Sequence, residues 1–470
     1  METAMQILSV YSPYDRRLVR ELPLATDRDA DDAIRDARET FLDRSKWLPK
    51  HERIRILTAF KSLLSQNADA LVGCAIAEGG KPLADTKVEM ARALGCVDIA
   101  IAELRGLHGS EIPMGLSAPA EQHLAYTMLE PAGVVVAISA FNHPINLIVH
   151  QVLPAVAAGC PVIVKPADTT PSACLRIVEL LVEAGLSRPW CRAIVCSRET
   201  TARMAADSRI AFVSFIGSAA VGWGVIRKNL APGVRCSLEH GGSAPAIVEP
   251  DADLDAILPG LVKAGYYHAG QVCISLKRLF VHRAILPALL ERMTSLVKSL
   301  RVGDPADAAT EVGPLIHPRE VDRVDTWVQE AVREGATLLC GGEKASGAGT
   351  CYRPTLLLNP SVASRVFADE VFGPVVSLIE YEDRLDAIRL ANSLPFCFQA
   401  SVFTRSLDTA LDTARRLKAR TVLINEHTTF RVDWMPFGGA EMSGLGTGGI
   451  GYALRELCSE KLLVIRSAAW

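Results

Sequence analysis

Cys273 and Glu239 are the two residues of this chain whose types and surroundings best suit covalent chemistry. Cys273 follows a glycine in the segment AGQVCIS, and Glu239 opens the segment EHGGSAP. A thiolate can attack a carbonyl carbon, and a carboxylate can activate the water that hydrolyses the resulting thioester. The alternative is that Cys273 is a small buried apolar residue and Glu239 a solvated one, as most such residues are.

Four further segments occur in a fixed order around this pair. PAGVVVAISAFNHP spans residues 131–144 and GCPVIVKPADTTP spans residues 159–171, while EVFGPV begins at Glu370 and PFGG at Pro436. In this order and at these spacings the chain resembles the aldehyde dehydrogenase superfamily, from about residue 7 to the C-terminus. The resemblance implies NAD(P)-dependent oxidation of an aldehyde to a carboxylic acid, through a cysteine thiohemiacetal and a thioester.

The resemblance also implies roles for the catalytic residues. Cys273 matches the nucleophile, and Asn142 matches the asparagine that stabilises the oxyanion together with the backbone N–H of Cys273. Loss of one such donor typically costs about a hundredfold to a thousandfold in rate. Glu239 matches the general base, which favours a free acid over a coenzyme A thioester as product. A coenzyme A-acylating semialdehyde dehydrogenase and a catalytically inactive scaffold are the alternatives.

Two positions depart from the pattern of the family. His240 follows the general base where leucine is usual, and it is either a packing residue or a group that shifts the pKa of Glu239. The segment 444–451 reads GLGTGGIG, where many relatives carry a pocket-facing glutamate. The glycines predict a tight loop, and the proton relay that this glutamate serves elsewhere must be absent or replaced.

The cofactor site is predicted from the segment after the expected strand 212–216, where helix N-terminal N–H groups favour a pyrophosphate. Asp168, after the strand 162–164, should accept from the ribose 2′-hydroxyl and repel a 2′-phosphate, so NAD is expected and NADP is possible. The cofactor-binding residues that the resemblance implies are Phe141, Lys165, Asp168, Gly217, Ser218, Gly222, Glu370 and Phe372.

The substrate is predicted from three polar or cationic residues near the expected entrance. They are Arg92, on the predicted helix 87–101, His143, after the oxyanion asparagine, and Arg431, before the PFGG turn. Paired cations suit phosphonate or carboxylate oxygens. We therefore expect a small anionic aldehyde, with phosphonoacetaldehyde first and lactaldehyde or a semialdehyde next, although Val272 stands where some relatives carry an anion-binding arginine.

The elements that must position these residues form two α/β regions. Short apolar runs alternate with helical patterns between residues 133 and 237, with a strand expected at 162–165 and helices at 171–183 and 219–228. This alternation predicts a doubly wound parallel sheet with helices on both faces. A second α/β region follows Glu239. With the resemblance, the predicted fold is that of an aldehyde dehydrogenase, and its parts are a NAD-binding domain (1–111 and 131–238), a catalytic domain (239–451) and a small β oligomerisation arm (112–130 and 452–470).

Composition narrows the class of protein further. The chain has 470 residues, is 49% hydrophobic, carries a formal net charge of −3 and contains 12 cysteines without C-x-x-C spacing. This near-neutral charge points to no nucleic-acid partner, and no apolar run reaches the roughly 20 residues of a membrane span. We expect reduced thiols in a cytoplasmic homodimer or homotetramer, with no bound metal.

Overall fold

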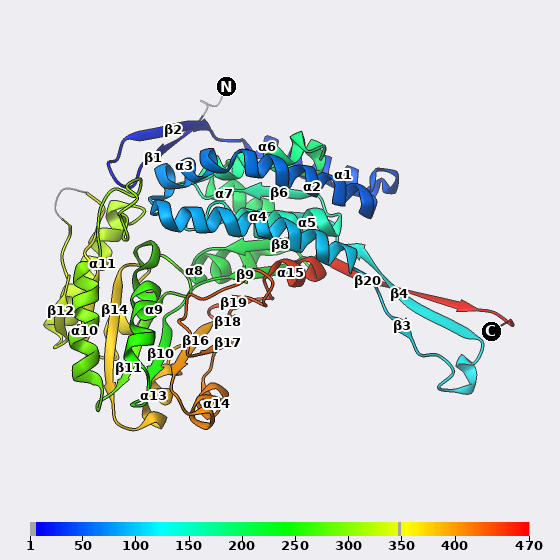
Figure 1. Ribbon diagram of the computed structural model, residues 1–470. Coiled ribbons are helices and arrows are strands. Elements are labelled where there is room, and N and C mark those ends of the chain that lie inside the picture. The colour runs from blue at the N-terminus through cyan, green and yellow to red at the C-terminus, as the bar shows by residue number, and fades with distance from the viewer. Residues whose placement is uncertain (1–5, 346–348, 470) are drawn as a thin grey trace.

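The computed structural model describes residues 6–345 and 349–469. Two open sheets with helices on their faces stand side by side, and a thin three-stranded arm projects away from them (Figure 1). Among the described residues, no helix is long and apolar enough to cross a membrane.

The first sheet has six strands in the order β19-β9-β8-β5-β6-β7. Its central strand β5 is buried throughout, and its residues alternate between two cores: Val135 and Ala137 face one, while Val134 and Val136 face the other. Helices therefore cover both faces, as the doubly wound prediction requires. The strands are β5 (Val134–Ile138), β6 (Val162–Lys165), β7 (Cys191–Ala193), β8 (Ile210–Ile216), β9 (Arg235–Glu239) and β19 (Gly444–Leu445).

Helices on one face of this sheet bury a larger core than those on the other. The larger core includes the wholly buried helix α5 (Asn146–Ala158), with α2 (Lys50–Gln66), α3 (Ala68–Gly79), α4 (Leu83–Arg105), α6 (Pro171–Glu183) and α15 (Ile450–Glu456). The smaller core lies under α1 (Asp27–Leu42) and α7 (Arg198–Ala206). A hairpin of β1 (Ile7–Tyr11) and β2 (Leu18–Pro23) precedes them.

The second sheet has seven strands in the order β12-β13-β14-β11-β10-β16-β17. All neighbours are parallel except β12 and β13. Its strands are β10 (Ala244–Val248), β11 (Leu276–His282), β12 (Thr337–Cys340), β13 (Thr355–Leu358), β14 (Val375–Tyr381), β16 (Gln399–Phe403) and β17 (Thr421–Ile424). The helices are α9 (Leu254–Tyr266), α10 (Leu286–Ser299), α11 (Pro318–Arg333), α12 (Arg365–Ala368), α13 (Arg384–Ala391) and α14 (Leu407–Arg416).

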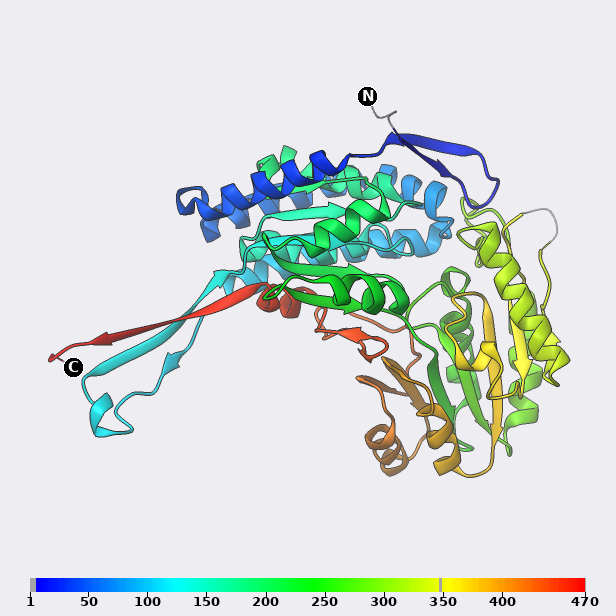
Figure 2. The ribbon, with the colours of Figure 1, turned by 180° about the vertical axis from the view of Figure 1, so that it is seen from behind.

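The projecting arm joins two distant parts of the chain. β4 (His123–Pro131) pairs antiparallel along its whole length with β20 (Cys458–Arg466), and β3 (Glu111–Ile112) adds a short edge. Figure 2 shows the same arm from behind, extending clear of both sheets. Its role in oligomerisation stays a prediction.

Two local expectations need correction, and one small sheet was not predicted. The helix expected at 219–228 is a short α8 (Ala219–Val221) followed by a π-helix over Gly222–Arg227. The segment 444–451 is not all loop, because β19 adds to the first sheet beside β9. A two-stranded sheet of β15 (Phe396–Cys397) and β18 (Ala440–Glu441), which the sequence did not predict, lies before it.

Candidate active site

The loop that presents Cys273 has an unusual backbone. Cys273 stands between a 3-10 turn (Tyr267–Gly270) and strand β11, and it is half-buried. Three consecutive residues before it have left-handed φ angles: His268 (49°), Ala269 (53°) and Gly270 (68°). Two of them carry a Cβ, so this conformation costs energy that the surrounding contacts must offset.

Lys277 holds this loop in place through two hydrogen bonds. Its ammonium donates to the carbonyl oxygens of Gly270 (3.0 Å) and Gly373 (2.7 Å). The backbones approach so closely that a Cβ on Gly270 would lie 2.2 Å from the oxygen of Gly373. Burial lowers the pKa of Lys277 to about 7, and the neighbouring Glu370 opposes that shift. Lys277 is therefore a positioning residue that sequence reasoning missed.

The thiol of Cys273 is protonated at rest. Burial raises its pKa to about 12, while the positive charge of Arg431 opposes the shift and the carboxylates of Glu239 and Glu370 add to it. A thiol in this setting reacts only when its proton is removed as it attacks. Glu239, the candidate base, can take this proton, and the positive charge of Arg431 stabilises the thiolate.

Asn142 is held next to the nucleophile. Its Nδ2 donates to the carbonyl oxygen of Gln271, two residues before Cys273, at 2.9 Å. Gln271 is itself anchored, because its Oε1 accepts from Ile316 N–H (2.9 Å) and its Nε2 donates to Pro314 O (3.2 Å). An amide has two N–H donors, so one remains for a substrate oxygen.

Glu239 ends β9, and β19 pairs with it through Gly444. Its Oε1 packs so tightly on Gly448 that a Cβ there would lie 2.4 Å away. Burial raises the pKa of Glu239, with the charge of Glu456 adding to the shift and Arg431 opposing it. A raised pKa suits a group that must take up and release a proton near neutral pH.

His240 is a packing residue. Its Nδ1 donates to the carbonyl oxygen of Gly217 at 3.0 Å, and its ring lies between Phe215 and Trp223, with ring centroids 5.7 and 6.0 Å away. The ring fills the space beside Gly222, where a Cβ would lie 1.9 Å from it. Of the two hypotheses for His240, these contacts favour packing, and they tie the end of β9 to the predicted pyrophosphate loop.

The surroundings of Glu370 fit its predicted role of holding the nicotinamide ribose. Its Oε1 is buried without a hydrogen-bond partner in the described part of the chain, and a Cβ on Gly241 would lie 1.6 Å from it. Burial raises the pKa of Glu370 to about 7, which Lys277 opposes. An orphaned carboxylate oxygen fits a ribose hydroxyl as its donor. Phe372 meets Phe141 edge to face at 5.9 Å beside it.

Three more predicted cofactor residues lie at the carboxyl edge of the first sheet. Gly217 and Ser218 follow β8, and Ser218 is the N-cap of α8. Gly222 follows at the start of the π-helix. Free N–H groups at this turn can receive an anion, although the helix that they open is short.

A third residue, Arg198, lies beside Lys165 and Asp168, the two residues predicted to bind the adenosine ribose. Lys165, at the end of β6, forms an ion pair with Asp168, and Nε of Arg198 lies 4.0 Å from the other oxygen of that carboxylate. Arg198 is 80% exposed at the start of α7. An exposed guanidinium here offsets the repulsion between Asp168 and a 2′-phosphate.

Arg431 is a cation whose charge acts on both Cys273 and Glu239. Its guanidinium carbon lies 3.5 Å from the centroid of the Phe437 ring, which packs on Phe398 at 4.8 Å. Its Nε is buried and, within the described residues, has no hydrogen-bond partner. Its charge lowers the pKa of both Cys273 and Glu239.

Arg92 and His143 have partners within the protein, and their contact with the substrate stays a prediction. Nε and Nη2 of Arg92 donate to the two carboxylate oxygens of Asp433, at 3.0 and 2.6 Å, so the charge of Arg92 is already compensated. Nε2 of His143 lies 3.3 Å from the Tyr267 hydroxyl, and burial together with Lys81 holds the pKa of His143 well below its usual range. The three predicted residues do lie in one region, and among their buried polar atoms Nε of Arg431 has no hydrogen-bond partner in the described part of the chain.

Asp433 is a site residue that sequence reasoning missed. Besides Arg92, it binds His150 (2.8 Å) and lies 4.0 Å from Nε of Arg431. Cys96, His150 and Asp433 place donor atoms within 4.8 Å of one another, which is a possible metal geometry. Two guanidinium groups on the same carboxylate would repel a cation, so this cluster is better described as an ion-pair network.

A model of the aldehyde dehydrogenase family matches residues 1–463. The chain belongs to this family. It is 33% identical over 465 residues to the 3-sulfolactaldehyde dehydrogenase of Priestia aryabhattai, covering 99% of this chain and 96% of that protein. It is 31% identical over 464 residues to the lactaldehyde dehydrogenase of Methanocaldococcus jannaschii, covering 97% of each.

Solved structures confirm the predicted fold of this aldehyde dehydrogenase. Aldehyde dehydrogenase 21 from Physcomitrella patens, in complex with its reaction product succinate, superimposes with a TM-score of 0.95 at 30% identity, covering 100% of this chain and 96% of that one. A glyceraldehyde-3-phosphate dehydrogenase from Methanocaldococcus jannaschii, complexed with NADP, gives 0.93 at 29% identity, covering 99% and 100%. The protein is thus an oxidoreductase.

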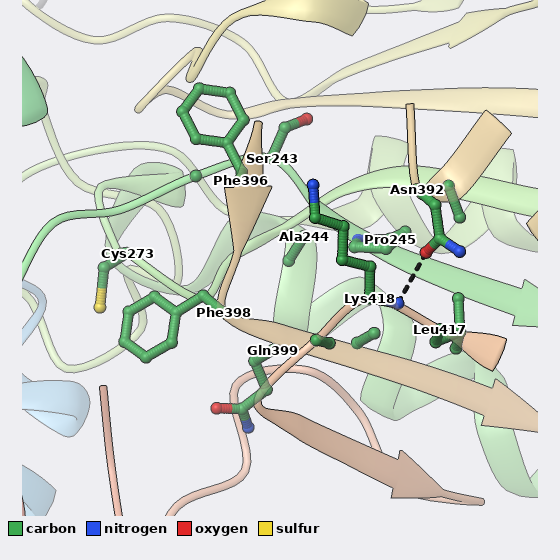
Figure 3. Close-up of a pocket in the computed structure, with 14 residues that line it drawn as sticks. Ser243, Ala244, Pro245, Cys273, Asn392, Phe396, Phe398, Gln399, Leu417 and Lys418 are labelled. Carbon is green, nitrogen blue, oxygen red and sulfur yellow. Dashed lines mark hydrogen bonds between the residues drawn. The ribbon is translucent and has the colours of Figure 1, made fainter. Parts of the chain in front are cut away.

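A pocket of the dehydrogenase reaches Cys273 from the side of the second sheet. Figure 3 shows Cys273 at one end, Asn392 and Leu417 at the other, and the rings of Phe396 and Phe398 between them. Lys418 lies along the pocket, and its backbone N–H donates to Oδ1 of Asn392 at 2.7 Å. The aromatic rings form an apolar wall beside the nucleophile.

Proposed function

We propose that this aldehyde dehydrogenase oxidises a small monoanionic aldehyde, bearing a sulfonate or a carboxylate, to the acid with NAD as hydride acceptor. The proposal rests on Arg431. Its Nε is buried and, within the described residues, has no hydrogen-bond partner, and its positive charge acts on the pKa of Cys273 and of Glu239. A guanidinium that is short of a partner in a dry site favours an anion there.

The charge of the network favours one negative charge on the substrate. Arg92 and Arg431 carry two positive charges and Asp433 one negative charge, while His150 is neutral because burial lowers its pKa to about 4. A monoanion adds one negative charge beside Asp433 and Glu239, whereas a phosphonate dianion adds two in the same buried place and is therefore less favourable. We therefore place phosphonoacetaldehyde behind the sulfonate and carboxylate aldehydes.

The relatives support this substrate class. One similar protein acts on 3-sulfolactaldehyde, and a similar structure holds succinate. Lactaldehyde, the substrate named for another relative, has no charge for Arg431 to hold and is the alternative. The predicted cofactor is confirmed as NAD(P), because neighbouring structures contain NADP or are NAD-dependent. The preference for NAD over NADP is our proposal.

The residues suit the following first half-reaction. Sγ of Cys273 bonds to the aldehyde carbon while the thiol proton moves to Glu239. The free N–H of Asn142 and the N–H of Cys273 donate to the oxyanion, and Arg431 holds the anionic group. NAD(P), when bound, supplies the acceptor of the hydride that leaves this carbon, and Glu370 would hold its ribose. A thioester on Cys273 results.

Glu239 completes the second half-reaction. Once it has lost the first proton, it takes another from a water whose oxygen bonds to the thioester carbon. The C–S bond then breaks, the acid leaves as its anion, and the proton of the new carboxyl group restores the thiol of Cys273. A thioester that water can reach in this way gives the free acid without coenzyme A.

A panel of aldehydes tests the proposal. Steady-state kcat/KM is measured from NADH absorbance with 3-sulfolactaldehyde, succinic semialdehyde, phosphonoacetaldehyde, lactaldehyde and propanal. The sulfonate or carboxylate should exceed propanal by about tenfold or more, the value of one charge-assisted hydrogen bond. Equal rates with lactaldehyde would favour the alternative. Turnover only with added coenzyme A would indicate the acylating enzyme, and no NADH with any aldehyde the inactive scaffold.

Three further assignments are proposed. The arm exposes Leu462, Val464 and Ile465 on β20, at 55%, 50% and 42%, which supports a homodimer or homotetramer built on it. All twelve cysteines, which lie in the described part of the chain, are free thiols, and this supports the cytoplasm as the compartment. The domain boundaries remain a proposal, and β19 and α15, which the prediction placed in the catalytic domain and the arm, add to the first sheet and its larger core.

A further inference from the structure

A small cavity lies behind the general base, away from Cys273. It has a volume of about 20 Å³, enough for one water molecule. Two carboxylates line it, Glu239 from β9 and Glu456 from α15. Polar groups are frequent among its other lining residues, which include His150, Gln151, Ser214, Ser237 and Thr447. A water in such a cavity has hydrogen-bond partners on several sides.

Glycines make room for Glu239 to reach this cavity. Its Oε1 occupies the place beside Gly448 that a side chain would need, since a Cβ there would lie 2.4 Å away. Gly446 plays the same part for the second carboxylate, because its Cβ would lie 3.1 Å from Oε2 of Glu456. The segment that lacks the glutamate of many relatives thus brings two other carboxylates to one cavity.

Glu456 is placed between the cavity and the solvent. It is half-buried, and its Oε1 accepts from the N–H of Thr447 at 2.8 Å. Burial raises its pKa, while that hydrogen bond and the charges of Arg235 and Arg420 oppose the shift. Glu456 can therefore exist both with and without a proton, and its partial exposure lets it exchange that proton with bulk water.

We propose that Glu456 accepts the protons that Glu239 collects in each turnover, through a water in this cavity. The inference rests on the proposed role of Glu239 as general base. The carboxylic acid of Glu239 gives its proton to the cavity water as that water gives one of its own to Glu456, which releases it to the solvent. No electrons are exchanged, and Glu239 returns to the carboxylate needed for the next proton.

The other charged groups near the cavity leave Glu456 as the acceptor. His150 on α5 is neutral, and its ring nitrogens face Asp433 and Arg431. Asp433 accepts hydrogen bonds from His150 and Arg92, which keep its pKa well below the usual range. Arg235 on β9 and Arg420 ahead of β17 are cations that accept no proton, and they stabilise the charged form of Glu456.

The test follows the acyl-enzyme directly. Wild type, Glu456→Gln and Glu456→Asp are mixed with NAD and an aldehyde, quenched at intervals, and the mass of the Cys273 thioester is followed together with the NADH burst. Glu456→Gln should keep most of the burst and lengthen the lifetime of the thioester about tenfold or more near pH 7, as expected for loss of a proton acceptor. Glu456→Asp should restore much of the wild-type lifetime.

A pH profile separates proton transfer from a structural effect. The thioester of Glu456→Gln should decay faster as pH rises, and added imidazole buffer should speed it more than it speeds wild type, because buffer bases replace the lost acceptor. Glu291→Gln, an exposed substitution on α10, is the matched control and should behave as wild type. Circular dichroism melts check that each variant is folded.

The outcomes distinguish this inference from the proposed function. An unchanged thioester lifetime in Glu456→Gln, or an equal loss of burst and decay without buffer rescue, would overturn the role of Glu456. The assay works with any aldehyde that the wild type oxidises, propanal included, so a substrate class other than the proposed one leaves the result intact. Loss of thioester decay in Glu239→Gln is the reference for a blocked base.

Discussion

Cys273 forms the bond to the substrate, whereas Glu239 takes a proton in both half-reactions, so their substitutions should have different effects. Cys273→Ala should abolish NADH formation while NAD still binds, because the thiol forms the bond to carbon and is not among the groups predicted to hold the dinucleotide. Glu239→Gln should slow the NADH burst, because the thiol loses its proton acceptor, and should leave a thioester that hydrolyses about a hundredfold more slowly or worse. NAD titrations by protein fluorescence and rapid-quench mass spectrometry check both. Substantial turnover by Cys273→Ala would remove it from the mechanism.

The two arginines should differ when each is replaced. Arg431→Ala should raise KM for an anionic aldehyde about tenfold to a hundredfold and leave KM for propanal nearly unchanged, while kcat should fall with both because the charge of Arg431 opposes the rise in the pKa of Cys273. Arg92→Ala removes the main partner of the buried Asp433, so it should lower the melting temperature and affect charged and neutral aldehydes alike. Arg431→Lys is the control that keeps the charge. Equal effects of Arg431→Ala on both aldehydes would contradict an anion site at Arg431.

The binding of NAD should depend on pH through Glu370. Burial raises the pKa of this carboxyl to about 7, so it is protonated below that pH and a full acceptor for ribose hydroxyls only above it. The dissociation constant of NAD should therefore rise as pH falls through about 7. Fluorescence titration from pH 5.5 to 8.5 measures this, and Glu370→Gln should bind weakly at every pH. A flat wild-type profile would show that Glu370 does not contact the cofactor.

At the scale of elements, the facing ends of β6 and α7 should set the cofactor preference. Asp168→Ser removes a negative charge from the ribose pocket and should tighten NADP binding about tenfold or more. Arg198→Ala, which removes the opposing cation, should weaken NADP and barely change NAD. Calorimetry with both dinucleotides measures the four constants. If wild type binds NADP as tightly as NAD, the assignment of Asp168 is wrong.

Elements with strong local signals could be predicted from the sequence. β6 and α6 have the predicted limits, because β-branched residues follow a Gly-Cys-Pro turn in one and Pro171 opens the other. β9 was missed, since RCSLE is short and mostly polar. The π-helix Gly222–Arg227 was taken for a plain helix because nothing in its composition marks the wider turn.

The residues of the candidate site, too, could be predicted only where a local sequence signal marks them. Cys273, Glu239 and Asn142 stand in recognisable local segments, and the structure brings them together in one region. Asp433 and Glu456 could not be found in this way, because each is defined by partners on other elements. Asp433 is 341 residues from Arg92, and a single sequence carries no sign of that pairing. For the same reason, Arg92 was predicted as a substrate-binding residue without its ion pair to Asp433.

At the scale of the molecule, the arm is the part of the subunit that most needs a contact outside the subunit to be stable. β4 and β20 pair along nine residues but extend beyond both cores, and β20 exposes apolar side chains. A two- or three-stranded sheet with one open apolar face is marginal in water unless another surface covers it. The arm should therefore lie against a second copy of the chain.

Leu462→Asp combined with Val464→Asp tests this expectation, because two charges placed in an apolar contact oppose association. Light scattering after gel filtration should show a homodimer or homotetramer for wild type and a smaller species for the variant. Glu460→Gln, an exposed change on the same strand, is the control and should assemble as wild type. Circular dichroism should be nearly unchanged, because both sheets keep their own cores. A variant that keeps the wild-type mass would place the subunit contact elsewhere, and a wild type that is a monomer would leave the exposed face of β20 without a partner copy.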